Sequence, residues 1–179
     1  MEEIIQLHDS KRIPLSSKER NNMKKIYPYY GATSVMDYVD NYIFDGTYLL
    51  LGEDGTVIDD NGFPILQYIF GKFWVNNHAH IITGKLGYSV EILYLLFKTT
   101  NVKSIVTGAV QPKISQGNLK NLPVIIPEKN ILIKFNNIIQ PIFQQIKNLK
   151  LENEKLTNLK NYLLPKLMNG EIDVENIEL

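Results

Sequence analysis

The stretch ILIKFNNIIQPIFQQIKNLKLENEKLTNLKNYL, residues 131–163, carries a seven-residue repeat. Its first row consists of Phe135, Ile142, Leu149, Leu156 and Leu163. A second row consists of Ile131, Ile138, Gln145, Glu152 and Leu159. The repeat predicts a long helix whose seam is apolar at both ends and polar in the middle, which favours one partner and register at some cost in stability. Folding back on the chain's own domain is the alternative, but a strict repeat favours pairing with another helix.

Prolines and a change of composition delimit this helical region. Pro141 is expected to kink the helix or to begin its second segment, and Pro165 is expected to end it. Before Pro127 the chain is rich in Gly, Tyr and Phe, whereas no further Gly follows until Gly170. We therefore predict a globular domain at residues 1–127 and a helical region at residues 128–179.

The globular part has the pattern of a mixed α/β domain. Its turn signals are Asp45-Gly46, Asp54-Gly55 and Asn61-Gly62. Short apolar runs predict buried strands at residues 48–51, 80–83 and 124–126. Helical spacing of apolar residues predicts a helix over residues 89–99, with Ser89 as its N-cap. The expected fold class is α+β, a globular mixed α/β domain followed by a long C-terminal helix that forms a coiled coil.

Composition narrows the class of protein. With 179 residues and 44% hydrophobic residues, the chain is able to build a core. It has no Cys, which excludes disulfides and fits a reducing compartment. No run reaches the ~20 apolar residues of a membrane span, and the N-terminus is acidic where a signal peptide is basic. We expect a cytoplasmic protein.

Charges are segregated along a chain of zero net charge. Residues 11–25 contain six bases and one acid, residues 98–120 contain four bases and no acid, and residues 37–60 contain seven acids and no base. Zero net charge counts against nucleic-acid binding, but its uneven distribution allows a positive face. Ordinary solvated surfaces are the alternative explanation of the segregation.

Catalytic signatures are missing from the sequence. It contains no phosphate-binding loop, no Gly-x-Ser-x-Gly and no His-Glu-x-x-His. His78 and His80 would face one side of a strand, but without a further ligand signal we interpret them as core or hydrogen-bonding histidines. We predict a non-catalytic binding module with no metal site and no cofactor of its own.

Four segments in this order resemble one protein family. They are YPYYGAT (27–33) followed by residues 37–40, 44–46 and 50–55; GKFWVNNHAH (71–80); TGAVQPK (107–113) followed by residues 118–123 and Pro127; and LLPKLMNGEI (163–172). Together they resemble the specificity subunits of type I restriction-modification systems, and the resemblance covers nearly the whole chain.

The resemblance implies a division of labour. Such a subunit carries two DNA target-recognition domains, each followed by a helix, and the two helices pack antiparallel as a ruler between two half-sites. Methylation, which uses S-adenosylmethionine, and cleavage belong to separate modification and restriction subunits. This chain has one domain and one helix, so we expect a half-subunit, or a truncated copy, that directs those partners to a bipartite site in double-stranded DNA. The expected homodimer interface comprises Ile138, Ile142, Leu149, Leu156, Leu159 and Leu163.

Several loops are candidates for DNA contact. The small residues of loop 31–34 allow close approach of the backbone, and residues 76–78 offer amides and an imidazole to bases or phosphates. Gln111 suits adenine, and Lys113 suits phosphate or guanine, in a loop without acids. For each residue, a place in a turn or in the core is the alternative. The full set is Arg12, Tyr29, Tyr30, Thr33, Lys72, Asn76, Asn77, His78, Thr107, Gln111 and Lys113.

Two other functions remain open on sequence alone. One is a regulatory protein that dimerises through its helix and never recognises DNA. The other is the recognition domain of a fused restriction-methylation enzyme, which requires methyltransferase motifs that these residues lack.

Overall fold

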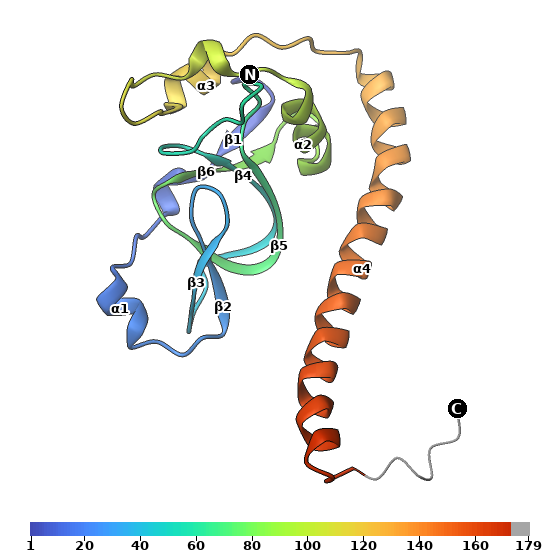
Figure 1. The fold of residues 1–179 in the computed structure, drawn as a ribbon. Helices are drawn as coiled ribbons and strands as arrows, with labels where there is room; N and C mark the ends of the chain where they lie inside the picture. Colours follow the sequence, from blue (N-terminus) through green and yellow to red (C-terminus); the bar gives the residue numbers. More distant parts are fainter. Residues whose placement is uncertain (173–179) are drawn as a thin grey trace. The chain divides into compact units, whose positions relative to one another are not determined.

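The computed structural model describes residues 1–172, which fall into two compact units, residues 1–139 and the residues from 140 onward (Figure 1). A mixed sheet organises the first unit. Its strands are β1 (Ile5–Leu7), β2 (Tyr27–Tyr30), β3 (Val35–Val39), β4 (Phe44–Gly52), β5 (Leu66–Val75) and β6 (Ala79–Gly84). Their order across the sheet is β1-β6-β4-β5-β2-β3. Neighbouring strands are antiparallel, apart from the parallel pair β2 and β5.

Short helices connect the strands, and one of them packs on the sheet. The helices of the first unit are η1 (Asp9–Lys11), α1 (Ser17–Asn21), α2 (Val90–Thr99), η2 (Lys103–Ile105) and α3 (Gln116–Asn121). Helix α2 packs against β4, β5 and β6 (Figure 1). The Ser89 hydroxyl caps it by accepting a hydrogen bond from the Ile92 N–H at 3.3 Å. The prediction of this helix and its cap is confirmed.

Strand β4 corrects one predicted turn. Asp45-Gly46 lies inside this strand, where Gly46 pairs with Gly71 of β5. Their φ angles are +133° and +86°, so both glycines bend the hairpin in a region that other residues avoid. The glycine marks an irregular strand position instead of a chain reversal. The strands predicted at residues 48–51 and 80–83 are confirmed as parts of β4 and β6.

Apolar side chains of the central strands form the core. A cluster of buried residues comprises Phe44, Leu50, Ile69, Phe73, Val75, Ala79 and Ile81. The rings of Phe44 and Phe73 stack with centroids 5.3 Å apart, and Tyr30 meets Phe73 edge-on. This packing fixes the ends of β4 and β5 and the start of β6, where residues 53–55 and 76–78 leave the sheet.

Helix α4 (Lys129–Met168) spans 40 residues. It continues through Pro141 and runs three residues past Pro165, so the prediction that Pro165 ends the helix is wrong. A proline in a helix removes one hydrogen bond and bends the axis, and a long helix tolerates that loss. The strand predicted at residues 124–126 is also wrong, because this segment forms no ladder and lies between Pro123 and Pro127. The α+β class with a long C-terminal helix is confirmed.

No helix within residues 1–172 combines the length and the apolar character that crossing a membrane requires.

Candidate nucleic-acid interface

Loop 107–113 is a closed hairpin in the structure. Thr107 and Lys113 exchange two backbone hydrogen bonds of 2.9 and 2.8 Å at its base. Gly108 has φ +86°, and a Cβ there would lie 2.3 Å from the Gln111 carbonyl oxygen, so only glycine fits. Val110 at the tip is 99% exposed and Gln111 is also exposed. The sequence TGAVQPK therefore forms a defined loop that presents its tip to solvent.

The base of this loop is attached to the end of β4. The Gly55 N–H donates to the Pro112 carbonyl at 3.0 Å, and the Ile114 N–H donates to the Glu53 carbonyl at 2.8 Å. The Lys113 ammonium lies 3.2 Å from a Glu53 carboxylate oxygen. Because β4 belongs to the centre of the sheet, these contacts give the loop a rigid support.

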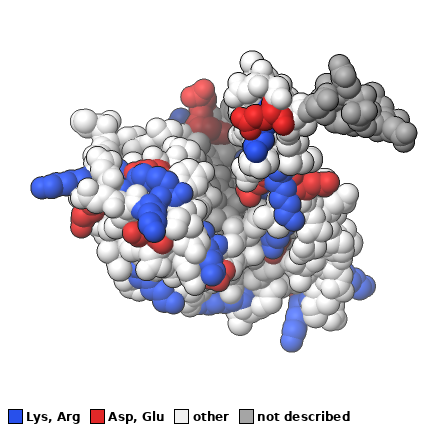
Figure 2. Space-filling view, turned by 90° about the horizontal axis from the view of Figure 1, so that it is seen from below, with Lys and Arg blue, Asp and Glu red and all other residues white. Residues whose placement is uncertain are grey.

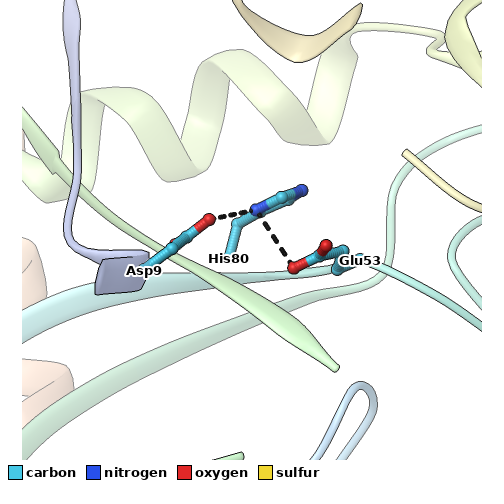
Figure 3. Close-up of side chains that lie close together, drawn as sticks. All are labelled: Asp9, Glu53 and His80. Atoms are coloured by element: carbon cyan, nitrogen blue, oxygen red, sulfur yellow. Dashed lines mark hydrogen bonds and ion pairs between the residues drawn. The ribbon is translucent and has the colours of Figure 1, made fainter. Parts of the chain in front are cut away.

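Glu53 also belongs to a buried ion network with Asp9, Arg12 and His80 (Figure 3). One Arg12 nitrogen lies 2.5 Å from Glu53 Oε2 and also donates to the carbonyls of Asn77 and Ala79. His80 Nδ1 lies 2.6 Å from Asp9 Oδ2 and 3.6 Å from Glu53 Oε2. The network joins the N-terminal segment to the start of β6 and the end of β4.

The acidic groups of this network are held ionised by their partners. Burial raises the pKa of Asp9, but the hydrogen bond from His80, the His80 charge and the Ile81 N–H outweigh it, so the pKa is lowered. Burial likewise raises the pKa of Glu53, and Arg12, His80 and Lys113 together lower it. Asp9 and Glu53 therefore carry negative charge inside the domain.

The same three side chains bring possible metal ligands together. Atoms of Asp9, Glu53 and His80 lie within 4.8 Å of one another. However, Arg12 and Lys113 already occupy both oxygens of Glu53, and the second His80 nitrogen faces the Ile114 carbonyl at 2.7 Å. Guanidinium and ammonium groups at these distances replace a metal ion as counter-charge, so the arrangement fits an ion network.

Residues 76–78 form a turn in which the three predicted DNA contacts differ in exposure. Asn76 is 4% exposed, and its side-chain oxygen accepts from the His78 N–H at 2.8 Å. Asn77 is exposed, and His78 is half-buried and paired with Asp54. The structure thus corrects the prediction for Asn76, whose amide shapes the turn and presents no surface to DNA.

Tyr29 is corrected in the same way. It is 1% exposed, and its hydroxyl accepts from the Leu15 N–H at 3.0 Å. Tyr30 is half-buried against Phe73, whereas Thr33 lies exposed in the loop after β2. An alternating strand pattern places one tyrosine of a pair inside, and the sequence alone does not say which.

The remaining predicted residues differ in their availability. Arg12 is committed to the ion network, with a side chain 13% exposed. Lys72 is exposed, and its ammonium lies 4.6 Å from the centre of the Tyr42 ring. On β5 it is the register partner of Asp45, which lies near the start of β4. Since β4 runs on to Gly52 before the loops begin, Lys72 lies at the opposite end of this strand.

Three loops, 31–34, 76–78 and 107–113, lie beside the end of β4 and the residues that follow it. Gly52 lies beside loop 31–34, because a Cβ there would be 3.5 Å from the Ala32 carbonyl oxygen. Asp54 pairs with His78 and forms a backbone bridge with Lys113. The loops beside the end of β4 carry six of the predicted contacts, namely Thr33, Asn77, His78, Thr107, Gln111 and Lys113. We call this set the loop cluster.

The sequence did not identify Asp9, Glu53 and Asp54 as organisers of this region. The sequence feature that could have identified Glu53 and Asp54 is the Glu53-Asp54-Gly55 turn directly after a buried strand. At such a turn, acidic side chains are able to pair with basic side chains of other loops. Lys25 and Arg20 pair with Asp37 in a similar way. The pKa of Asp37 is lowered to about 2, most of all by the hydrogen bond from Lys25 and further by those from the Tyr38 N–H and Arg20.

These pairs use part of the charge that is segregated in the sequence. Bases of segment 11–25 and of the loop pair with acids of segment 37–60. On the face seen in Figure 2, basic and acidic side chains are interspersed. This face therefore presents no broad, uniformly positive patch.

Comparison with known proteins identifies the family. A family model described as the type I restriction modification DNA specificity domain matches residues 1–161. A Haemophilus influenzae protein, whose name assigns it to the specificity subunits of type I restriction enzymes, is 29% identical over 142 residues, which is 79% of this chain and 36% of that protein. The MjaIX specificity subunit of Methanocaldococcus jannaschii is 32% identical over 109 residues, 59% of this chain and 25% of that protein.

A solved structure has the same fold. The S subunit of a type I restriction-modification system from M. genitalium matches with a TM-score of 0.65 and 16% identity, over 92% of this chain and 43% of that one. The chain spans 36% or less of the length of the curated relatives that it matches. Since the family model covers residues 1–161 of 179, the chain belongs to the family of type I restriction modification DNA specificity domains.

Proposed function

We propose that this chain is a DNA-recognising half of a specificity subunit and directs methyltransferase and restriction subunits to a bipartite site. Residues 1–127 recognise one half-site, and residues 128–179 act as spacer, dimerisation element and docking region. The chain itself performs no catalysis, and S-adenosylmethionine binds to the methyltransferase partner. The observation that carries the DNA-recognition part is the solvent-exposed loop 107–113, held rigidly on the sheet and free of acidic side chains.

The exposed seam of α4 supports the dimer. Ile138, Ile142, Leu149, Leu156 and Leu159 are all between 50% and 64% exposed, and Leu163 is partly exposed. Such a stripe is unfavourable in water and needs a partner helix. A second copy supplies an identical stripe, and an antiparallel pair obeys two-fold symmetry. Two identical domains then recognise an interrupted palindrome, with a gap set by a seam of about 50 Å.

Gln111→Ala and Lys113→Ala test the DNA-recognition part. If Lys113 contacts a phosphate, its replacement lowers affinity for all sequences and flattens the salt dependence by roughly one unit. If Lys113 or Gln111 contacts a base, affinity falls for one base position by about 1–3 kcal/mol. Fluorescence anisotropy with duplex DNA at several salt concentrations measures both effects.

Lys98→Ala is the matched control, since Lys98 is an exposed lysine on α2, outside the loop cluster. It should leave binding unchanged. Wild-type affinity in both loop variants removes loop 107–113 from the interface. If the wild-type chain shows no salt-dependent DNA binding at all, a regulatory protein without DNA recognition becomes the better description.

A further inference from the structure

His80 is a buried histidine whose two ring nitrogens both face hydrogen-bond acceptors. Figure 3 shows the nitrogen that faces Asp9. Its exposure is 0%. Nδ1 lies 2.6 Å from Asp9 Oδ2, and Nε2 lies 2.7 Å from the Ile114 carbonyl oxygen. A neutral imidazole has one donor and one acceptor nitrogen, so this environment is satisfied only by a ring that donates twice.

Asp9 cannot supply the missing proton, because donors surround it. Its Oδ1 accepts from the Ile81 N–H at 2.9 Å, and its Oδ2 accepts from the Gln116 side-chain amide at 2.6 Å. The Arg12 guanidinium lies 3.6 Å from Oδ2. The charges that face His80 are therefore Asp9 and Glu53, with Arg12 and Lys113 as the neighbouring cations. These four charges already sum to zero, so the case for an imidazolium rests on the two acceptors that face the ring.

The contact with Ile114 connects the ring to the loop. Ile114 directly follows Lys113, and its side chain is 0% exposed. Its N–H donates to the Glu53 carbonyl, and its carbonyl accepts from His80. Two hydrogen bonds of the Ile114 backbone therefore fix the end of loop 107–113, and His80 makes the second of them.

We propose that His80, held as an imidazolium by Asp9, is a positioning residue that fixes loop 107–113 for DNA recognition. This inference rests on the proposed function for the role of the loop. The position of the loop itself does not depend on that role, so the two are measured separately.

Two substitutions separate the two hydrogen bonds of the ring. In His80→Gln the amide nitrogen reaches the place of Nε2 and donates to Ile114. In His80→Asn the amide reaches only the place of Nδ1 and donates to Asp9. We expect amide exchange at Thr107, Lys113 and Ile114, relative to paired amides of β4 and β5, to be roughly ten-fold or more faster in His80→Asn. His80→Gln should restore most of this protection.

A purely structural role for His80 would loosen the sheet and the loop alike. Equal loop protection in the two variants overturns the positioning role. Nitrogen NMR of the wild-type ring provides a test that does not depend on the folding of either variant. Two protonated nitrogens support the proposal, and one unprotonated nitrogen overturns it.

Affinity for duplex DNA then distinguishes the two proposals. A loss in His80→Asn that His80→Gln largely restores supports both. If His80→Asn loosens the loop and DNA affinity stays at the wild-type value, the loop is not a DNA-recognition element, while its fixation by His80 stands.

Discussion

Replacing Leu149 and Leu156 together by Asp is expected to convert a self-associated chain into a monomer. The two leucines are 50% and 55% exposed, so pairing buries about half of each. That burial contributes about 1 kcal/mol per leucine, or about 4 kcal/mol for the four in a dimer. Placing four carboxylates in the seam adds a desolvation penalty of several kcal/mol. We expect the dimer to weaken by about 10³-fold or more.

Leu151→Asp is the matched control. Leu151 lies on the same helix and is 45% exposed, but it falls outside both rows of the repeat. The same charge there should leave the dimer intact. Analytical ultracentrifugation of the wild-type chain and both variants at tens of micromolar measures the result. A wild-type monomer, or a dimer that tolerates the double substitution, rules out this seam as the interface.

Arg12→Ala is expected to destabilise the globular domain by about 3–5 kcal/mol, the usual cost of removing one partner from a buried ion pair. Arg12 lies 2.5 Å from Glu53 and 3.6 Å from Asp9, and it donates to the backbone carbonyls of Asn77 and of Ala79 at the start of β6. Its loss leaves both carboxylates with one counter-charge fewer. Urea unfolding followed by far-UV circular dichroism measures the change.

Lys11→Ala serves as control, because Lys11 is the exposed neighbour of Arg12 and should change stability by less than about 0.5 kcal/mol. The experiment also decides between two roles for Arg12. The sequence placed it among the DNA contacts, whereas the structure gives it internal partners. A variant with wild-type stability and lost DNA affinity would restore the sequence-based role.

Local patterns in the sequence predicted the elements that depend on local chemistry. The apolar run at residues 48–51, the capped helix after Ser89 and the long heptad helix all appear in the structure. The turn prediction at Asp45-Gly46 was wrong because Gly46 pairs with Gly71 of the neighbouring strand, a partner that lies 25 residues away in the sequence. Pairing partners, and not the dipeptide itself, decide whether such a glycine ends a strand.

The candidate site was predicted as loops but not as a network. The sequence placed Lys113 and Gln111 in an exposed loop, and the structure shows that loop closed and supported. Asp9 and His80 are 71 residues apart, and Arg12 and Glu53 are 41 apart, so no spacing rule links them. Tyr29 and Asn76 were indistinguishable in sequence from Tyr30 and Asn77, which are less buried, since burial depends on which face of the sheet is covered.

We propose that two copies of this chain together direct methylation to a symmetric, interrupted DNA site. Single-molecule methylome sequencing of a host that carries the chain and its methyltransferase, before and after deletion of the chain, tests this most directly. We predict a palindromic motif with a central gap that loses its methylation on deletion and regains it with the wild-type chain, but not with Leu149→Asp/Leu156→Asp. A methylome that is unchanged by the deletion would rule out a role of this chain in directing methylation.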